Sequence, residues 1–399
     1  MRKKKILIIQ LFFYPDLSAV PQLLGELLSA IGEEKETEWE FTVLCGTFAH
    51  TLEVHNKLPK FLGKVRIKRL RGLHIGKKSI WRRLVSSITY YISVSMYLVF
   101  NAGKYDLVIS CTTPPLIGFV SALATWHRNT EFIYYIQDLY PELLFDMGYI
   151  KRVWILKKLG FLNKFVIFRA RKVITIGERM NKKLVNNYGV AVDKLTIVPN
   201  WAPGVDYFEP VLNDSFVILY SGNFGLAHDF GLLPGLVRQF SMLDNICYHL
   251  IGGGKQFEQV QNIISSQGED RILAEGYVSL EQHSARISVG NLLVIAQKES
   301  TVGDILPSKF YSYLAAGRPI LYLGPKISEI SQYIEEHQIG CTVEIPRDIV
   351  RADAYLKNLI NDKEAYMILC RKVRSLYETD FGLEYSKNRF TTVLESVLN

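Results

Sequence analysis

The chain has 399 residues and a net charge of +8, with 48% hydrophobic and 22% charged residues. This length exceeds what one ordinary hydrophobic core accommodates, so we expect about two domains. The five cysteines lie far apart and show no metal-ligand spacing. The composition therefore excludes a disulfide-stapled or cysteine-liganded metal protein, and it favours reduced core cysteines in the cytosol.

Short apolar runs alternate with helical patterns along the chain, which is typical of parallel, doubly wound sheets. The first run follows the basic start "MRKKK" and breaks at "YPD", so it predicts a buried strand and not a signal peptide. Strands are predicted at residues 6–13, 40–46, 65–70, 105–111, 132–138 and 172–177, and after an interruption at 216–222, 247–254, 271–278, 291–297, 319–324 and 340–345.

One-sided positive charge marks the N-terminal half. Residues 54–105 contain no Asp or Glu but carry twelve Lys or Arg side chains. Within this region, residues 84–102 have no charge, yet their Ser, Thr and Tyr content makes them a poor membrane span. With Ile88, Ile92 and Val99 on one side, they predict a helix that packs on a sheet and is partly exposed to lipid.

Residues 153–168 interleave Trp and Phe with Lys, as at a membrane interface, where lysines attract lipid phosphates and rings insert. No nucleic-acid-binding motif accompanies the basic residues. We therefore hypothesise that segment 57–83 and helix 153–168 rest on an anionic membrane surface, and we expect no nucleic-acid partner.

In the same half, "IYYIQDLYPE" ends a strand with Asp138, and "CTTPPLIG" ends another with Thr112 and Thr113. Ligands of parallel sheets bind beyond the carboxyl ends of the strands. Asp138 is therefore a candidate catalytic or substrate-binding acid. The alternative, that it caps the following helix, remains open.

The strand pattern is interrupted by "VPNWAPGVDYFEPVLND" at residues 198–214. Three prolines, a glycine and two asparagines break any periodicity there, as at a domain boundary. We predict an N-terminal domain at residues 1–200, a C-terminal domain at 201–380 and a terminal helix at 381–399.

Two glycine-rich strand ends in the C-terminal half are candidate phosphate sites. "SGNFG" contains Gly222, Asn223 and Gly225, and a helix is expected to follow it; "IGGGK" contains Gly253. Glycines let a ligand approach the backbone, and a helix N-terminus attracts phosphate. A plain tight turn is the alternative for the first motif, and the second lacks the ending of a Walker loop.

A third candidate is "GDILPSKFYSYLAAGRP" at residues 303–319. Pro307 suits the first turn of a helix, and Ser308 is expected to contribute to its capping. Lys309 adds positive charge at the same anion site, and Asp304 precedes it, placed to bond hydroxyl groups. Gly317 ends the helix. The stretch predicts a site for a phosphate-bearing sugar, whereas an ordinary helix with a solvated lysine would explain Lys309 alone.

The order of "FYPDLSAVPQLLGELL", "TTPPL", "YYIQDLYPE", "VPNW", "YSGNFGLA", "IGGG" and "LPSKFYSYLAAGRPIL" resembles the family-4 glycosyltransferases of bacterial polysaccharide assembly. It is most similar to the colanic-acid and O-antigen branch of the fucosamine-transferase type. The resemblance runs from about residue 5 to about residue 380, and the pair "DLYPE" and "PSK…AAGRP" is fairly specific for that branch.

The resemblance implies a GT-B fold: two Rossmann-like, doubly wound α/β domains facing across a cleft, with the C-terminal helix crossing back to the N-terminal domain. The acceptor would bind the N-terminal domain and the UDP-sugar the C-terminal one, with retention of configuration, no cofactor and no metal. Without a metal, helix N-termini and basic side chains must neutralise the leaving diphosphate. That role falls to Gly222–Gly225 and Lys309.

Two departures from the family pattern concern the donor site. The family places two glutamates eight positions apart, the first near the sugar and the second on the ribose, where this chain has Asp304 and Ser312. Serine cannot accept two hydrogen bonds as a carboxylate does, but this branch often lacks the second acid. The Arg/Lys pair that many relatives carry after "SGN" is absent, and His228 is present instead. These departures raise the importance of Lys309.

The sequence thus predicts a glycosyltransferase at the cytosolic face of the membrane that moves a sugar from a UDP-sugar to a lipid-linked or growing glycan acceptor. Asp138, Asp304 and Lys309 are the predicted catalytic residues. Gly222, Asn223, Gly225, Gly253, Ser308, Lys309 and Ser312 are predicted to bind the nucleotide-sugar. A non-hydrolysing UDP-sugar epimerase and a non-catalytic nucleotide-sugar-binding partner of a synthesis complex are the alternatives.

Overall fold

A computed structural model describes residues 2–14, 16, 19–35, 38–47, 65–70, 80–211, 215–243, 245–266 and 271–399, with the side chains of residues 80–87 and 280–281 left out. The chain forms two compact units. The first comprises Met1–Pro203, Gly303–Ile305 and Leu383–Asn399, and the second comprises Gly204–Val302 and Leu306–Gly382.

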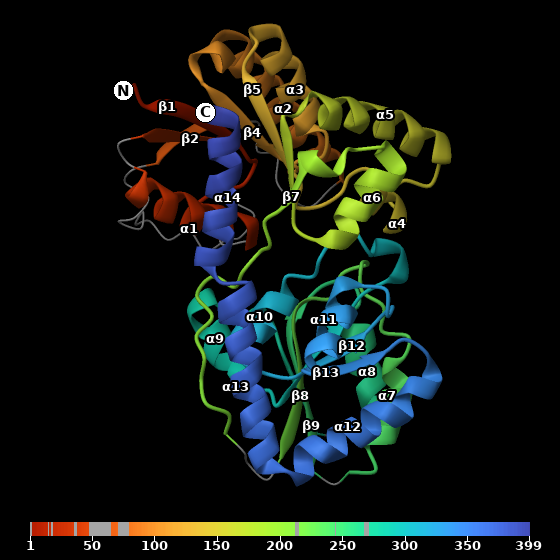
Figure 1. Ribbon diagram of the computed structural model, residues 1–399. Coiled ribbons are helices and arrows are strands. Elements are labelled where there is room, and N and C mark those ends of the chain that lie inside the picture. Colours follow the sequence, from red (N-terminus) through yellow and green to blue (C-terminus); the bar gives the residue numbers. More distant parts are fainter. Residues whose placement is uncertain are drawn as a thin grey trace. The chain divides into compact units, whose positions relative to one another are not determined.

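The first unit is built on a seven-stranded parallel sheet with strand order β3-β2-β1-β4-β5-β6-β7. Helices accompany the strands, as Figure 1 shows. In chain order the elements are β1 (Lys4–Ile9), α1 (Ala19–Glu34), β2 (Trp39–Gly46), β3 (Arg66–Leu70), α2 (Ile80–Asn101), β4 (Leu107–Cys111), α3 (Ile117–Arg128), β5 (Glu131–Tyr135), α4 (Glu142–Asp146), α5 (Val153–Arg169), β6 (Lys172–Thr175), α6 (Glu178–Tyr188), β7 (Leu195–Ile197) and α14 (Leu383–Leu398).

Strand burial explains this order. Ile6 to Ile9 of β1 have no exposed surface, and β2 and β4 pair with both edges of this strand. A strand buried on both faces needs a continuous apolar run, which "ILII" supplies. The charged residues of β3 suit its place at the sheet edge, where Arg66 pairs with Glu40.

Helix α14 belongs to the first unit although it is last in the chain. The buried ammonium of Lys387 forms ion pairs with Glu34 of α1 and with Glu384. Ser386 donates a 2.8 Å hydrogen bond to the carbonyl oxygen of Pro199, and the ring of Phe390 packs on Tyr135. The prediction that the terminal helix returns to the N-terminal domain is confirmed.

The second unit is built on a six-stranded parallel sheet with strand order β10-β9-β8-β11-β12-β13. Its elements are β8 (Phe216–Asn223), α7 (Leu233–Phe240), β9 (Ile246–Gly253), α8 (Phe257–Ser266), β10 (Ile272–Glu275), α9 (Leu280–Ser288), β11 (Leu292–Ala296), α10 (Lys309–Ala315), β12 (Ile320–Leu323), α11 (Glu329–His337), β13 (Gly340–Val343), α12 (Ile349–Asn361) and α13 (Lys363–Asp380).

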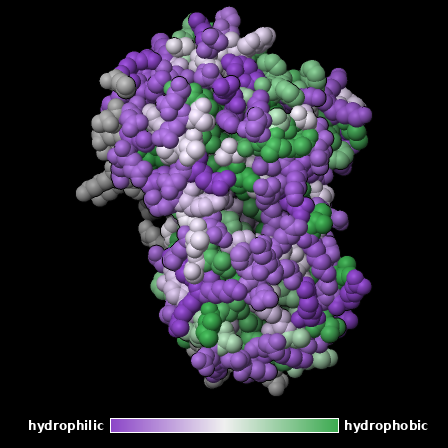
Figure 2. Space-filling view, in the orientation of Figure 1, coloured by the Kyte–Doolittle hydropathy of each residue, from purple (hydrophilic) through white to green (hydrophobic). Residues whose placement is uncertain are grey.

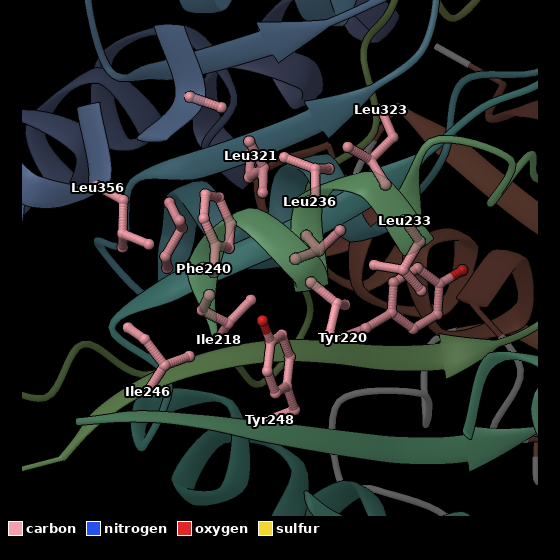
Figure 3. Packing of buried hydrophobic residues seen from close by; sticks show 14 of the residues in the cluster. Ile218, Tyr220, Leu233, Leu236, Phe240, Ile246, Tyr248, Leu321, Leu323 and Leu356 are labelled. Atoms are coloured by element: carbon pink, nitrogen blue, oxygen red, sulfur yellow. The ribbon is translucent and has the colours of Figure 1, made fainter. Parts of the chain in front are cut away.

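One hydrophobic core of the second unit lies between helix α7 and its sheet. Figure 3 shows Leu233, Leu236 and Phe240 of α7 above Ile218 and Tyr220 of β8. All five are buried. Tyr220 connects this core to the end of β8, because its hydroxyl donates a 3.1 Å hydrogen bond to the carbonyl oxygen of Asn223.

The predicted class of two parallel, Rossmann-like sheets is confirmed. All twelve predicted strands are present, with boundaries shifted by a few residues. The pattern missed β7, which has three residues and hence no readable alternation. Division between the units falls between Pro203 and Gly204, within the proline-rich stretch.

Helix α2 turns its predicted apolar side away from the sheet. Ile88, Ile92 and Val99 are exposed, whereas Val94 and Leu98 are fully buried. Among the described residues, no helix is both long and apolar enough to cross a membrane. Most of the basic segment 57–83 lies outside the described residues, so its predicted membrane contact stays a prediction.

Candidate functional site

Lys309 is the centre of the candidate site in the second unit. It is the first residue of α10, and its Nζ atom lies 3.3 Å from the carbonyl oxygen of Asn223. The same atom lies 4.8 Å from the centre of the Tyr220 ring, a distance at which an ammonium group is attracted by the ring face. Burial lowers the pKa of Lys309 to about 7. No acidic side chain of the described residues forms an ion pair with it.

Glycines at the ends of β8 and β9 allow the Lys309 ammonium to lie close to the backbone. Strands β8 and β9 stay paired to their ends, with Gly222 opposite Gly252 and Asn223 opposite Gly253. A Cβ atom on Gly222 would lie 3.0 Å from the Lys309 Nζ atom, and one on Gly252 would lie 2.1 Å from the Gly222 carbonyl oxygen. The predicted residues Gly222, Asn223, Gly253 and Lys309 are therefore brought together.

Two histidines and a serine complete this group. The Ser221 Oγ and His283 Nε2 atoms lie 3.3 Å apart, and the His228 Nδ1 atom lies 2.6 Å from the carbonyl oxygen of Ala296. Burial, followed by the charge of Lys309, lowers the pKa of His228 to about 4 and also lowers that of His283. Both imidazoles are therefore neutral near pH 7, and Lys309 is the group whose charge a bound anion would stabilise. We call Tyr220, Ser221, Gly222, Asn223, His228, His283 and Lys309 the Lys309 cluster.

The structure corrects two details of the predicted anion site. No helix follows Gly222–Gly225 directly: β8 continues to Asn223 because β9 pairs with it, and α7 begins only at Leu233. The Ser308 hydroxyl makes no capping hydrogen bond. A capping side chain needs an extended backbone, and the φ and ψ angles of Ser308, −61° and −21°, are already helical.

The remaining predicted residues of this unit are Gly225, Ser312 and Gly317. Gln256 donates a 2.6 Å hydrogen bond to the carbonyl oxygen of Gly225, which fixes the turn after β8. Ser312 lies three residues after Lys309 on α10 and is half-buried. Gly317 has a φ of 66° and ends α10 as predicted, since a left-handed residue is the usual helix stop.

A polar cavity of about 310 Å³ opens where β11, β12 and β13 end. Asp229, Gln297, Glu299, Gly324 and Glu344 are among its lining residues. Carboxylates accept hydrogen bonds from hydroxyl groups but repel phosphates. The cavity therefore suits a hydroxyl-rich ligand better than an anion.

Asp138 lies in the first unit, just beyond β5. Its backbone N–H, like that of Gln137, donates a 3.3 Å hydrogen bond to the Thr112 hydroxyl. Its carboxylate accepts a 3.3 Å hydrogen bond from Tyr140, and burial raises its pKa to about 6. Helix α4 begins at Glu142 with Pro141 as the residue before it, so Asp138 does not cap that helix.

Asp304 also belongs to the first unit. Its carbonyl oxygen accepts a 2.8 Å hydrogen bond from the Leu139 N–H, and its carboxylate, with no exposed surface, lies 2.5 Å from the Lys183 Nζ atom. The Asp146 carboxylate lies 3.9 Å from the same ammonium. Burial and the neighbouring Asp146 raise the pKa of Asp304.

Sequence reasoning missed several of these partners. The hydroxyl of Tyr313 accepts a 2.9 Å hydrogen bond from the Ser221 N–H. This residue could have been predicted, because it lies four residues after Lys309 on the same helix. Lys183 and His283 gave no signal, since neither lies in a recognisable motif. Their contacts depend on which strands are neighbours.

No protein-family profile matches the sequence. The chain is 25% identical over 278 residues to the probable glycosyltransferase WbjE of Pseudomonas aeruginosa, an alignment that covers 66% of this chain and 68% of that protein.

Solved structures resemble the chain along almost its whole length. HepE of Anabaena, in complex with UDP-glucose, has a TM-score of 0.68 at 13% identity and covers 98% of this chain and 99% of its own. WaaG, a glycosyltransferase of lipopolysaccharide biosynthesis, has a TM-score of 0.64 at 13% identity, with 97% and 99% covered. A Listeria monocytogenes protein assigned as a UDP-N-acetylglucosamine 2-epimerase has a TM-score of 0.62 at 14% identity, with 99% and 96% covered. With its two parallel sheets, the chain therefore has the GT-B fold of these proteins.

Proposed function

We propose that the protein is a glycosyltransferase that moves a sugar from a UDP-sugar to a polyprenyl-diphosphate-linked or growing glycan acceptor in cell-surface polysaccharide assembly. The observation that carries this proposal is the Lys309 ammonium at the paired ends of β8 and β9, with no acidic partner among the described residues. A cation with no ion-pair partner among the described residues can take a diphosphate as its counterion.

Relatives support the proposal. WbjE is named as a probable glycosyltransferase, HepE binds UDP-glucose, and WaaG acts in lipopolysaccharide biosynthesis. The same proposal includes membership of family 4, a reaction that retains the anomeric configuration, and independence of metal. It also assigns the acceptor to the first unit and the UDP-sugar to the second. So does peripheral attachment to the inner face of the membrane through segment 57–83 and α5.

In the proposed reaction, the bond between the anomeric carbon and the UDP oxygen breaks, and an acceptor oxygen bonds to that carbon. Negative charge grows on the departing diphosphate, and Lys309 would stabilise it together with backbone N–H groups near Gly222, Asn223, Gly225 and Gly253. Ser308 and Ser312 would line the nucleotide-sugar. The acceptor hydroxyl loses a proton, which the Asp138 carboxylate can accept, because its pKa of about 6 leaves it ionised at neutral pH.

A two-stage experiment tests this function. A thermal-shift panel of UDP, UDP-sugars and other nucleotide-sugars should show stabilisation by UDP compounds, because a ligand that binds only the folded state raises the melting temperature. A lipid-linked acceptor should then be required for UDP release. Isomerisation of the UDP-sugar without acceptor would instead establish an epimerase, the activity assigned to the Listeria neighbour. Binding without either reaction would indicate a non-catalytic partner.

A further inference from the structure

The outward face of helix α2 is apolar. Ile88, Ile92, Met96 and Val99 recur at helical spacing, and each is about half exposed or more. An amphipathic helix of a water-soluble unit normally turns polar side chains outward. A contiguous exposed apolar stripe marks an interaction surface.

Helices α3 and α5 extend this stripe. Leu123 and Trp126 of α3 are exposed, and the Trp126 ring lies 6.1 Å from that of Phe165 on α5. The outer side of α5 carries Phe161 and Phe168, also exposed. Figure 2 shows hydrophobic surface over α5. We call the outward sides of α2, α3 and α5 the three-helix face.

A pocket of about 470 Å³ opens on the three-helix face between α2 and α3. It is lined by Ser95, Val99, Phe119, Leu123, Trp126 and His127, among others. The Ser95 hydroxyl already donates a 2.8 Å hydrogen bond to the carbonyl oxygen of Tyr91. Apart from His127, the lining thus offers little to a polar ligand, and it suits a hydrocarbon chain.

The charged side chains of these three helices have one sign. None of the three helices contains Asp or Glu. Lys158 and Lys164 of α5 are exposed and lie over the rings of Trp154 and Phe168, at 5.1 and 5.7 Å. Arg128 is exposed at the end of α3 and donates hydrogen bonds to the carbonyl oxygen of Val99 beside the pocket. Basic side chains around an apolar surface complement an anionic lipid leaflet.

We propose that the three-helix face docks on an anionic phospholipid leaflet and that one acyl chain of that leaflet enters the pocket between α2 and α3. The surface is wider than the predicted segment 57–83, the predicted apolar side of residues 84–102 and helix 153–168, because it adds α3 and the pocket. The inference rests on the proposed function for its purpose, which is to bring the enzyme to a lipid-linked acceptor. Docking itself is measured without turnover.

The first experiment compares two methionines in the full chain. Met96 on α2 is 60% exposed, and Met242 in the second unit is 75% exposed. Co-sedimentation with vesicles of phosphatidylcholine and phosphatidylglycerol in equal parts should be about tenfold weaker or more for Met96→Glu, because a charge cannot enter the leaflet cheaply, and unchanged for Met242→Glu. Equal binding of Met96→Glu and wild type would overturn the proposal.

The second experiment tests the pocket. Phosphatidylglycerol with brominated acyl chains should quench the fluorescence of Trp126, measured as the difference between wild type and Trp126→Phe. Ala124, another lining residue, allows the pocket to be filled while the surface stays apolar. Ala124→Phe should keep vesicle binding and lose most of this quenching. Unchanged quenching in Ala124→Phe would refute chain entry.

Two controls distinguish lipid docking from self-association and from loss of the fold. Light scattering of the lipid-free protein should give the same mass for wild type and Met96→Glu; a dimer that only the wild type forms would mean that a second copy covers this face. Met96→Glu should also retain the thermal shift with UDP. Lipid docking without any change in melting temperature on adding UDP would contradict the proposed function but not the docking surface. A thermal shift with UDP but no lipid docking would contradict the docking surface but not the proposed function.

Discussion

The Nζ atom of Lys309 and the hydroxyl of Tyr220 meet at the same acceptor, the carbonyl oxygen of Asn223, at 3.3 and 3.1 Å. A buried core residue of β8 thus holds the strand end beside which the lysine lies. Helix α10 supplies the lysine, and Tyr313 on the same helix bonds to Ser221. The site is therefore as rigid as the pairing of β8 and β9 and the packing of α10.

UDP affinity should depend on pH through Lys309. The pKa of Lys309 is about 7 in the free protein, and a bound diphosphate favours the charged form. Affinity is then highest below pH 7 and falls as pH rises above it, by up to about tenfold per pH unit, until the pKa of the complex is reached. Calorimetric titration across this range measures the slope. Lys309→Met should abolish this fall in affinity above pH 7, and Lys372→Met, an exposed lysine of α13, should preserve it.

Turnover should depend on Lys309 more than on any other basic residue of the cluster. Removing one preorganised charge from the departing diphosphate should lower kcat about 100- to 1000-fold in Lys309→Met. His228→Asn should cost less, because a pKa of about 4 leaves His228 uncharged. Rates of acceptor-dependent UDP release give both values. A near-normal rate in Lys309→Met would refute the assigned role.

The close pairing of β8 and β9 should require glycine at residue 252. Gly252 has a φ of 127°, and an added Cβ would lie 2.1 Å from the Gly222 carbonyl oxygen. Gly252→Ala should destabilise the second unit by about 2 kcal/mol or more and weaken UDP binding. Gly276 has nothing within 4 Å, so Gly276→Ala should stay within about 0.5 kcal/mol of wild type in urea unfolding.

Arg318 should be a large contributor to the stability of the second unit. It has no exposed surface, and its guanidinium donates hydrogen bonds to the carbonyl oxygens of Phe208, Ser288 and Gly290, among others. Arg318→Met would leave these oxygens without the guanidinium donor, at a cost of about 3 kcal/mol or more. Arg371→Met removes only an exposed ion pair with Glu209 and should cost less than about 1 kcal/mol. Thermal or urea unfolding compares the two.

The stability of the first unit should depend on the contact between Lys183 and Asp304. At a pH where Asp304 is ionised, Lys183→Met would leave a fully buried carboxylate without its cation and destabilise the region by about 3 kcal/mol. Burial raises the pKa of Asp304, so the loss should grow as pH rises and the carboxylate ionises. Hydrogen exchange of α4 and α6 reports the loss. Asp304→Asn added to Lys183→Met should recover part of it; no recovery would show that the two residues are not coupled.

Much of the fold and part of the candidate site could be predicted from local sequence patterns. A strand of a parallel sheet is buried on both faces, so it needs a run of apolar residues that can be read without knowing its neighbours. Gly222, Asn223 and Lys309 were predictable for a similar reason: they lie at the ends of readable elements.

Contacts between distant elements were decided by tertiary structure alone. Asp304 was predicted beside Lys309 by its closeness in sequence, but Gly303–Ile305 packs with the first unit, where Lys183 meets its carboxylate. His283 reaches Ser221 from another helix. Helix α2 has apolar residues on more than one side, and only the sheet beneath it determined that Val94 and Leu98 are buried while Ile92 and Met96 are exposed. Periodicity gives the faces of a helix, whereas burial depends on what lies against each face.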